Sequence, residues 1–211
     1  GKYLVSGKTK NFDSLKDSPE NTGIKSLELK KFDLRSFSFK PNENKGTVIV
    51  LIGRRDTGKS FLVRDLLFYQ QDIPIGTVIS GTEAGNGFYS NHVPKLFIHE
   101  EYNTAIIENI LKRQKQVLKQ VKKEDQSFKK SNIDPRAFVI FDDCLYDNTW
   151  AKDKLMRLLF MNGRHWKIML VITMQYPLGI PPNLRTTIDY VFILREPYIT
   201  KRKRIYENYA V

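Results

Sequence analysis

The chain has 211 residues, enough for one α/β domain with a proper core but too few for a comfortable second domain. Its 35 Lys and Arg residues against 23 Asp and Glu residues give a net charge of +12, which favours a polyanionic partner such as nucleic acid over an acidic protein surface. The single cysteine, Cys144, excludes an internal disulfide, and no Cys/His cluster in the sequence has zinc-ligand spacing. No apolar stretch reaches the roughly 18 residues of a membrane span and no signal peptide is evident, so we expect an intracellular protein.

Polar residues with little periodicity fill residues 1–25, which predicts a mobile N-terminal arm ahead of one folded domain over residues 26–211. Partial alternation of apolar and polar residues over 27–39 predicts one or two lead-in strands at a sheet edge. Unbroken apolar runs predict buried strands at 46–52, 76–80, 137–141, 168–173 and 190–194, and a shorter one at 95–98.

Helical spacing of apolar residues predicts helices after 60, over 102–123 and over 150–161, the last with Leu155, Leu158, Leu159 and Met161 facing inward. Strands that alternate with helices predict an α/β three-layer sandwich around a mostly parallel sheet.

A P-loop motif follows the first of these core strands. Residues 53–60, GRRDTGKS, fit the pattern G-x-x-x-x-G-K-[ST] without a mismatch, and a predicted strand and helix flank them. The glycines let backbone N–H groups curl around phosphates, Lys59 should reach the β- and γ-phosphates of ATP, and the Ser60 hydroxyl should coordinate Mg²⁺. The predicted nucleotide contacts are Gly53, Arg54, Arg55, Asp56, Thr57, Gly58, Lys59, Ser60 and Phe61.

Nucleotide hydrolysis needs a second acidic element at the end of a neighbouring strand. Asp142 and Asp143 end the strand at 137–141; Asp142 is placed to hold Mg²⁺ and Asp143 to polarise the attacking water. The usual residue in additional-strand ATPases is Glu, so the base remains open between Asp143 and Glu83, which lies in the polar loop after the strand at 76–80. Gln175, at the end of a strand that would lie between those of the two motifs, is a candidate sensor of the γ-phosphate.

Arginine from a neighbouring subunit can neutralise charge in the transition state. Arg164 and Arg185, in connections near the sheet ends, are the candidates for such a finger.

Two basic clusters are candidate DNA contacts, either of which could equally be a solvated helix face. The first comprises Lys112, Arg113, Lys115, Lys119, Lys122, Lys123, Lys129 and Lys130, and the second Lys201, Arg202, Lys203 and Arg204. We expect Tyr198, Tyr206 and Tyr209 beside the second cluster to pack rather than to stack on bases.

Several motifs besides the P-loop resemble those of a particular family more specifically than the P-loop alone does. They include residues 76–83 (GTVISGTE), 142–144 (DDC), 162–165 (NGRH), 173–176 (TMQY) and 195–197 (REP). Together they resemble the DNA-packaging ATPases of large nucleocytoplasmic DNA viruses, a viral branch of the FtsK-HerA superfamily, over about residues 27–210.

This resemblance implies a P-loop NTPase domain of the additional-strand, RecA/FtsK-like type in an ATP-driven translocase that moves double-stranded DNA into a capsid. It implies a homo-oligomeric ring of five or six subunits, capsid or portal partners, and a location in the host cytoplasm or the virion. Asp-Asp replaces Asp-Glu in that group, which makes Asp143 a plausible catalytic carboxylate. Members extend further at the C-terminal end, so we expect a C-terminal piece to be missing here.

Two other functions share the P-loop. A small-molecule or nucleotide kinase should bring a mobile Arg-rich lid and an acceptor pocket, neither of which is evident in the sequence. A non-motor nucleic-acid-binding protein with a degenerate P-loop is disfavoured because Lys59, Ser60 and Asp142 are intact. A GTPase is discounted because the guanine-reading motif Asn-Lys-x-Asp is absent from the sequence.

Overall fold

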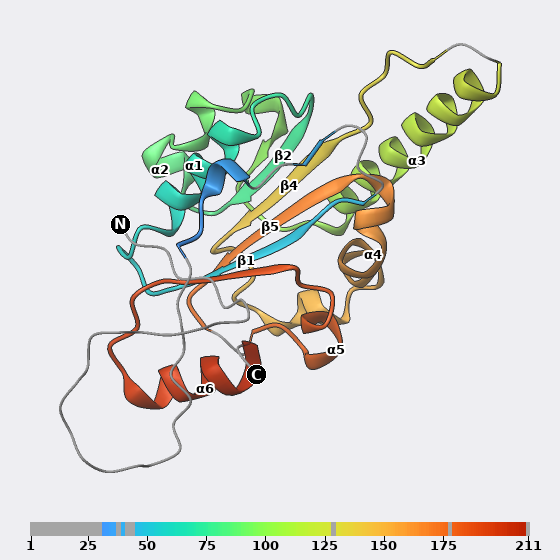
Figure 1. Cartoon of the computed structure of the whole chain (residues 1–211). Helices are drawn as coiled ribbons and strands as arrows, with labels where there is room; N and C mark the ends of the chain where they lie inside the picture. The colour runs from blue at the N-terminus through green and yellow to red at the C-terminus, as the bar shows by residue number, and fades with distance from the viewer. Residues whose placement is uncertain (1–30, 37–38, 41–44, 128–129, 177–178, 210–211) are drawn as a thin grey trace.

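Within the residues described by the computed structural model, 31–36, 39–40, 45–127, 130–176 and 179–209, six strands form one sheet (Figure 1). The predicted arm at 1–25 lies outside these residues. The sheet order is β3-β2-β4-β5-β1-β6, and every pairing is parallel. The strands are β1 Val48–Ile52, β2 Gly76–Ser80, β3 Ile98–His99, β4 Ala137–Asp142, β5 Ile168–Met174 and β6 Tyr190–Ile193.

The three central strands, β4, β5 and β1, are buried along their whole length. Both of their faces are covered, which is why they read as unbroken apolar runs in the sequence. The predicted order, with β5 between the strands that precede the P-loop and the acidic pair, is confirmed. Most of the strand predicted at 95–98 is instead the 3₁₀ turn η3, Lys95–Phe97, which leads into the two-residue β3.

Helices cover both faces of the sheet, as a three-layer sandwich requires (Figure 1). On one face, α1 (Lys59–Tyr69) packs Leu62 and Leu66 against alternate residues of the central strands. The opposite face buries Ile107 of α3 (Thr104–Gln126) and Met156 of α4 (Lys154–Asn162) in a second core. The remaining helices are α2 Glu83–Asn86, α5 Pro182–Arg185 and α6 Ile199–Tyr209. The predicted α/β P-loop architecture is therefore confirmed.

The prediction of lead-in strands at 27–39 is wrong for the described residues of this range, 31–36 and 39. Leu34–Ser36 form a 3₁₀ turn, η1, and Lys31 makes only an isolated bridge. Phe32 packs on the rings of Tyr190 and Phe192 at the β6 edge, while Leu34 and Phe39 enter the core on the α1 face. These apolar side chains reach the core from a turn and irregular backbone, so their alternation does not reflect a strand.

The helix predicted over 150–161 is divided at Asp153. The 3₁₀ turn η4, Asn148–Lys152, precedes α4, because the Asp153 side chain accepts from the backbone N–H groups of Leu155 and Met156 and so caps the new helix. Met161 was predicted to face inward but is 50% exposed. No helix in the described part of the chain combines the length and apolar composition that a bilayer crossing needs.

Candidate functional site

The loop between β1 and α1 has the backbone shape of an anion-binding loop. Gly58 ends it with φ +94°, and Asp56 also lies in the left-handed region with φ +58°. A Cβ at Gly53 would lie 2.6 Å from Thr57 Oγ1 and 2.9 Å from Leu194 Cβ, so only glycine fits there. Since α1 begins at Lys59, the unpaired N–H groups of its first turn open toward the loop and favour a bound anion.

Lys59 is buried and folded back onto its own loop. Its ammonium donates to the carbonyl oxygens of Gly53 at 2.9 Å and Arg54 at 3.0 Å. The same Nζ lies 3.2 Å from Asp143 Oδ2, in an ion pair whose side chains are 5% and 26% exposed. The structure therefore joins the P-loop lysine to the second carboxylate of the acidic pair.

The two carboxylates of that pair meet at Thr173 on the neighbouring strand. Asp142 and Thr173 are register partners in β4 and β5, and the threonine hydroxyl donates to Asp142 Oδ1 at 2.6 Å. The backbone N–H of Asp143 donates to the same hydroxyl oxygen at 3.0 Å. Asp143 itself adopts φ +48°, a left-handed conformation that Asp tolerates better than most residues. Thr173 thus positions both acids, a role that sequence reasoning missed although a lone hydroxyl in an apolar strand signalled it.

Burial raises the pKa of the Asp142 carboxyl, and the hydrogen bond from Thr173 opposes this effect. A buried carboxylate of this kind gains from a nearby cation, and a hydroxyl with a carboxylate is an oxygen donor set that Mg²⁺ accepts. Ser60 supplies the hydroxyl from the first turn of α1. The residues present therefore fit a magnesium ion that also contacts phosphate.

Glu83 is engaged by backbone on both carboxylate oxygens. It accepts from the N–H of Tyr89 at 2.8 Å and of Ser90 at 2.7 Å, which fixes the turn η2, Tyr89–Asn91. Tyr89 is 1% exposed, and burial together with the nearby Asp142 carboxylate raises the pKa of its hydroxyl. Glu83 thus holds the backbone of Tyr89, a buried residue near Asp142 that sequence reasoning did not find.

Gln175 reaches the same edge from the end of β5. Its Nε2 lies 3.4 Å from Asp143 Oδ2, and the side chain is exposed. Because β5 lies between β4 and β1, its carboxyl end brings Gln175 between the P-loop and the acidic pair. The structure thus brings together the predicted lysine, carboxylate and amide.

The two candidate finger arginines are both bound within the chain. Arg164 lies in η5, Gly163–Trp166, which precedes β5 at the amino edge of the sheet, and its Nη2 lies 2.8 Å from both carboxylate oxygens of Asp189. Arg185 in α5 donates to the carbonyl of Ile180 and to the side chain of Asn208. Neither contacts the P-loop of its own chain through these bonds.

Two hollows border Asp143, and Tyr146 lines both. The larger, about 630 Å³, is lined by Glu100, Glu101 and Asp147 together with Arg55, so carboxylates dominate its charge. The smaller, about 280 Å³, lies beside Gln175 and includes the exposed Tyr146. The larger hollow therefore suits a cationic group better than an anion.

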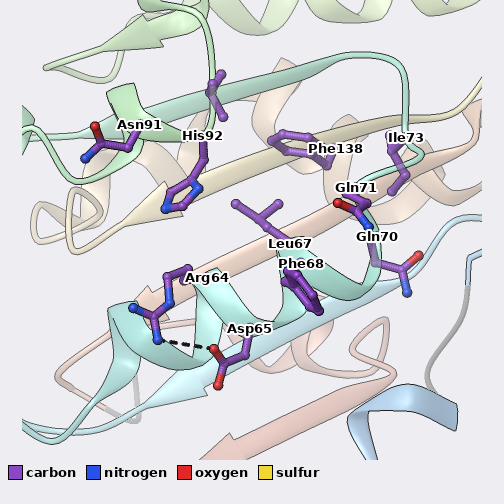
Figure 2. Close-up of a pocket in the computed structure, with 11 residues that line it drawn as sticks. Arg64, Asp65, Leu67, Phe68, Gln70, Gln71, Ile73, Asn91, His92 and Phe138 are labelled. Carbon is purple, nitrogen blue, oxygen red and sulfur yellow. Dashed lines mark hydrogen bonds and ion pairs between the residues drawn. The ribbon is translucent and has the colours of Figure 1, made fainter.

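A third hollow of about 560 Å³ lies beside α1, between it and the segment of Asn91 and His92, over the start of β4 (Figure 2). Leu67 and Phe68 of α1 border it, His92 closes one side, and Phe138 at the start of β4 lies at its back. Arg64 and Asp65 at its rim pair with each other at 3.5 Å. None of the described residues that line it belongs to the predicted nucleotide or DNA contacts, so this hollow is separate from the nucleotide site.

The two predicted basic clusters lie in different parts of the molecule. The first cluster's lysines on α3 are exposed, and Lys130 is exposed beyond its end, whereas Arg113 is partly buried and bonds to Gln114. Lys129 lies outside the described residues. The second cluster is on α6, where Lys201 Nζ lies 5.5 Å from the ring centroid of Tyr198.

That tyrosine connects the second cluster with the P-loop. The guanidinium of Arg54 lies 5.2 Å from the same ring centroid, and Tyr198 is 53% exposed. Tyr206 is also exposed, at 56%, whereas Tyr209 packs against the core; whether the exposed rings stack on bases stays a prediction. The second cluster therefore begins beside the nucleotide site.

Solved structures share this fold. The DNA-packaging ATPase B204 from Sulfolobus turreted icosahedral virus superposes with a TM-score of 0.52 at 16% identity, covering 80% of this chain and 84% of that one. ATPases 2 and 3 of EssC from Geobacillus thermodenitrificans give 0.58 at 15% identity, covering 85% and 36%. These likenesses confirm the P-loop ATPase fold.

Sequence relatives come from large DNA viruses. Protein L437 of Acanthamoeba polyphaga mimivirus is 41% identical over 186 residues, 87% of this chain and 62% of that protein. Protein 075L of Invertebrate iridescent virus 6 is 43% identical over 166 residues, 78% of this chain and 60% of that protein. This chain thus spans about three fifths of their length. The profile of the poxvirus A32 protein family matches residues 33–196, so this chain belongs to that family.

Proposed function

We propose that this protein is an ATP-hydrolysing, double-stranded DNA translocase that packages a viral genome into its capsid. The observation that carries the proposal is the meeting of Lys59, Asp143 and Gln175 at one sheet edge, in a chain of the poxvirus A32 family. B204, which shares the fold, is a DNA-packaging ATPase. The net charge of +12 favours a polyanionic substrate.

Nucleotide binding begins at the P-loop. Backbone N–H groups of the loop and of the first turn of α1 bind the triphosphate, and Lys59 exchanges Asp143 for the β- and γ-phosphates. Ser60 and Asp142 would hold Mg²⁺, which neutralises phosphate charge when bound. The Lys59–Asp143 ion pair therefore has to break when ATP binds.

Loss of that pair frees the Asp143 carboxylate to polarise the attacking water. Both oxygens of Glu83 already accept backbone N–H groups, which favours Asp143 over Glu83 as the base. Gln175, within reach of Asp143, is positioned to contact the γ-phosphate and the water. After hydrolysis and phosphate release, the loss of its contact with the γ-phosphate would signal the state of the nucleotide.

A ring of five or six copies would complete the site, because the acidic hollow beside Asp143 offers space and charge for a cation from a neighbouring subunit. Arg164 or Arg185 could supply it only by leaving its present partners. We propose that the protein also binds double-stranded DNA and capsid or portal proteins. We propose that it acts in the virus factory of the host cytoplasm or in the virion.

A small-molecule or nucleotide kinase remains the rival. Its acceptor would have to enter beside Asp143, where Glu100, Glu101 and Asp147 repel a phosphorylated compound. The charge of this hollow therefore argues against nucleotide acceptors.

Steady-state ATP hydrolysis with and without long double-stranded DNA tests the proposal, at two protein and two salt concentrations, with Lys59→Ala as the blank. The expected result is turnover that rises with DNA and with protein concentration and falls with salt. Turnover that is indifferent to DNA but stimulated by a small acceptor would establish the kinase instead. DNA binding without turnover would establish the non-motor protein.

A further inference from the structure

A strongly basic groove lies between α3 and η5, and we call it the α3–η5 groove. It encloses about 800 Å³. Its charged lining consists of Lys115, Lys119, Lys122 and Lys123 from α3 and Lys167 after η5, and His165 and Trp166 form part of its wall. No carboxylate is among the described residues that line it. The four ammonium groups of α3 repel one another in such a space, and a polyanion lying between them relieves this repulsion.

The wall of the groove is held rigidly. Lys115 Nζ lies 5.0 Å from the ring centroid of Trp166. The buried amide of Gln114 donates to the carbonyl oxygens of Pro135 at 2.8 Å and Trp166 at 2.7 Å, which ties α3 to η5. Arg164 ties η5 in turn to Asp189. The groove therefore exists before any ligand binds, which lowers the entropy cost of binding.

The spacing of the lysines suits a phosphate backbone. Lys115, Lys119 and Lys122 lie on one face of α3, and Lys115 to Lys123 spans about 12 Å of helix. One strand of B-DNA carries three or four phosphates over about this length. The far half of α3 extends beyond the sheet, where a duplex can approach it (Figure 1).

The α6 cluster differs in both position and partners. Lys201 lies on the Tyr198 ring beside the P-loop, Lys203 Nζ lies 3.9 Å from Glu207 Oε1, and Arg204 bonds to the Tyr176 hydroxyl. Tyr176 directly follows Gln175 at the carboxyl edge of the sheet. The α3–η5 groove instead lies at the amino edge, where the backbone N–H of Ala137 donates to the carbonyl of Lys167 as β4 and β5 begin.

We propose that the α3–η5 groove binds the sugar–phosphate backbone of duplex DNA and that the α6 cluster makes no substantial contribution to this binding. The assignment rests on the proposed translocase function. In this assignment, the DNA contact and the nucleotide site lie at opposite ends of the central strands. A conformational change at the acidic pair would therefore have to be transmitted through β4, β5 and α3 to affect DNA binding.

Fluorescence anisotropy of a labelled 30-base-pair duplex, titrated with the full chain over a range of salt concentrations, tests the groove. Lys119→Gln/Lys122→Gln should weaken binding about tenfold or more and make the slope of log K against log [salt] shallower by about 2. The matched control, Arg202→Gln/Lys203→Gln on α6, removes the same charge and should change the affinity less than about twofold. Thermal melting and ATP binding verify that both variants remain folded.

Tryptophan fluorescence adds an independent readout. Duplex binding should change the emission of wild-type protein, and Trp166→Phe should remove that change, because the other tryptophan, Trp150, is 2% exposed. A wild-type protein that binds duplex while the groove variant binds equally well overturns the groove and leaves the translocase proposal standing. A wild-type protein that hydrolyses ATP but binds no duplex overturns both.

Discussion

Lys59 Nζ lies 3.2 Å from Asp143 Oδ2, so the residue that should hold the γ-phosphate is paired with the residue that should activate water. Two carbonyl oxygens of the P-loop hold the same ammonium. In this arrangement neither group is available for its catalytic role. In the proposed mechanism, nucleotide separates the two groups and so couples phosphate binding to the release of the base.

Asp143→Asn should retain ATP binding and lower turnover by about 10²–10⁴-fold, because an amide cannot take a proton from water. Loss of the ion pair also leaves Lys59 freer to bind phosphate, so affinity for a slowly hydrolysed ATP analogue, measured by calorimetry, should stay equal or rise. Lys59→Ala, as the control, should lose that affinity. Unchanged turnover in Asp143→Asn would assign the base to Glu83.

Glu83→Gln should affect stability more than chemistry. An amide keeps one acceptor oxygen but leaves the N–H of Tyr89 or Ser90 without its partner, at a cost of about 1–3 kcal/mol. We expect a lower melting temperature with turnover retained within a few-fold at a temperature where the variant is folded. Loss of turnover at unchanged stability would instead make Glu83 a catalytic residue.

Thr173→Val should impair turnover without unfolding the protein. Valine has a similar volume but can neither donate to Asp142 nor accept from the N–H of Asp143, so both carboxylates lose their orientation. We expect turnover to fall about 10–100-fold, the range typical for residues that orient metal ligands. Thr173→Ser should restore most of it, and a serine variant as impaired as the valine variant would show that the methyl group, not the hydroxyl, matters.

Most of the candidate site at the carboxyl edge of the sheet was predictable, because its residues directly follow strands. Buried parallel strands are readable as apolar runs, and in parallel strands all carboxyl ends lie at one edge. The positions of Lys59, Asp143 and Gln175 along the chain therefore predicted that they would meet. Their contacts with one another in the structure agree with that expectation.

Other features depend on register and tertiary packing, which periodicity does not encode. Thr173 gains its role only because it lies opposite Asp142 across two strands. The residues 32–39 alternate like a strand, yet their apolar side chains fill the α1 face and the β6 edge. The helix expected from 150 begins only after Asp153, whose carboxylate caps it. Likewise, the charge of the two basic clusters alone could not tell which of them lies beside the P-loop.

Arg136→Met should destabilise the fold by about 1–3 kcal/mol, because it leaves the buried carbonyl of Phe39 and the partly buried carboxylate of Asp134 without their donor. The arginine side chain is 3% exposed, and Nη2 lies 2.7 Å from Asp134 Oδ2 and 2.9 Å from Asp72 Oδ2. Chemical unfolding measures the loss. Asp72→Asn is the control, since the Asp72 side chain is 63% exposed and its substitution should cost less than about 1 kcal/mol. Equal losses in the two variants would contradict this account.

Asp153→Asn should cost stability at neutral pH but much less in acid. Burial raises the pKa of Asp153, but hydrogen bonds from Thr104, Tyr102 and the first backbone N–H groups of α4 outweigh burial, and its pKa is lowered. A carboxyl with a lowered pKa stabilises the fold above its unfolded pKa of about 4, and this stabilisation is lost as pH falls through the folded value.

Urea unfolding of Asp153→Asn should therefore show a loss of about 1–2 kcal/mol at pH 7, the range for a charged helix cap, and a smaller loss near pH 3. Asp147→Asn is the matched control, because Asp147 is exposed and caps only the turn η4 through the N–H of Thr149. Its substitution should cost little at either pH. A loss in Asp153→Asn that is the same at both pH values would mean that the side chain's shape, rather than its charge, holds the start of α4.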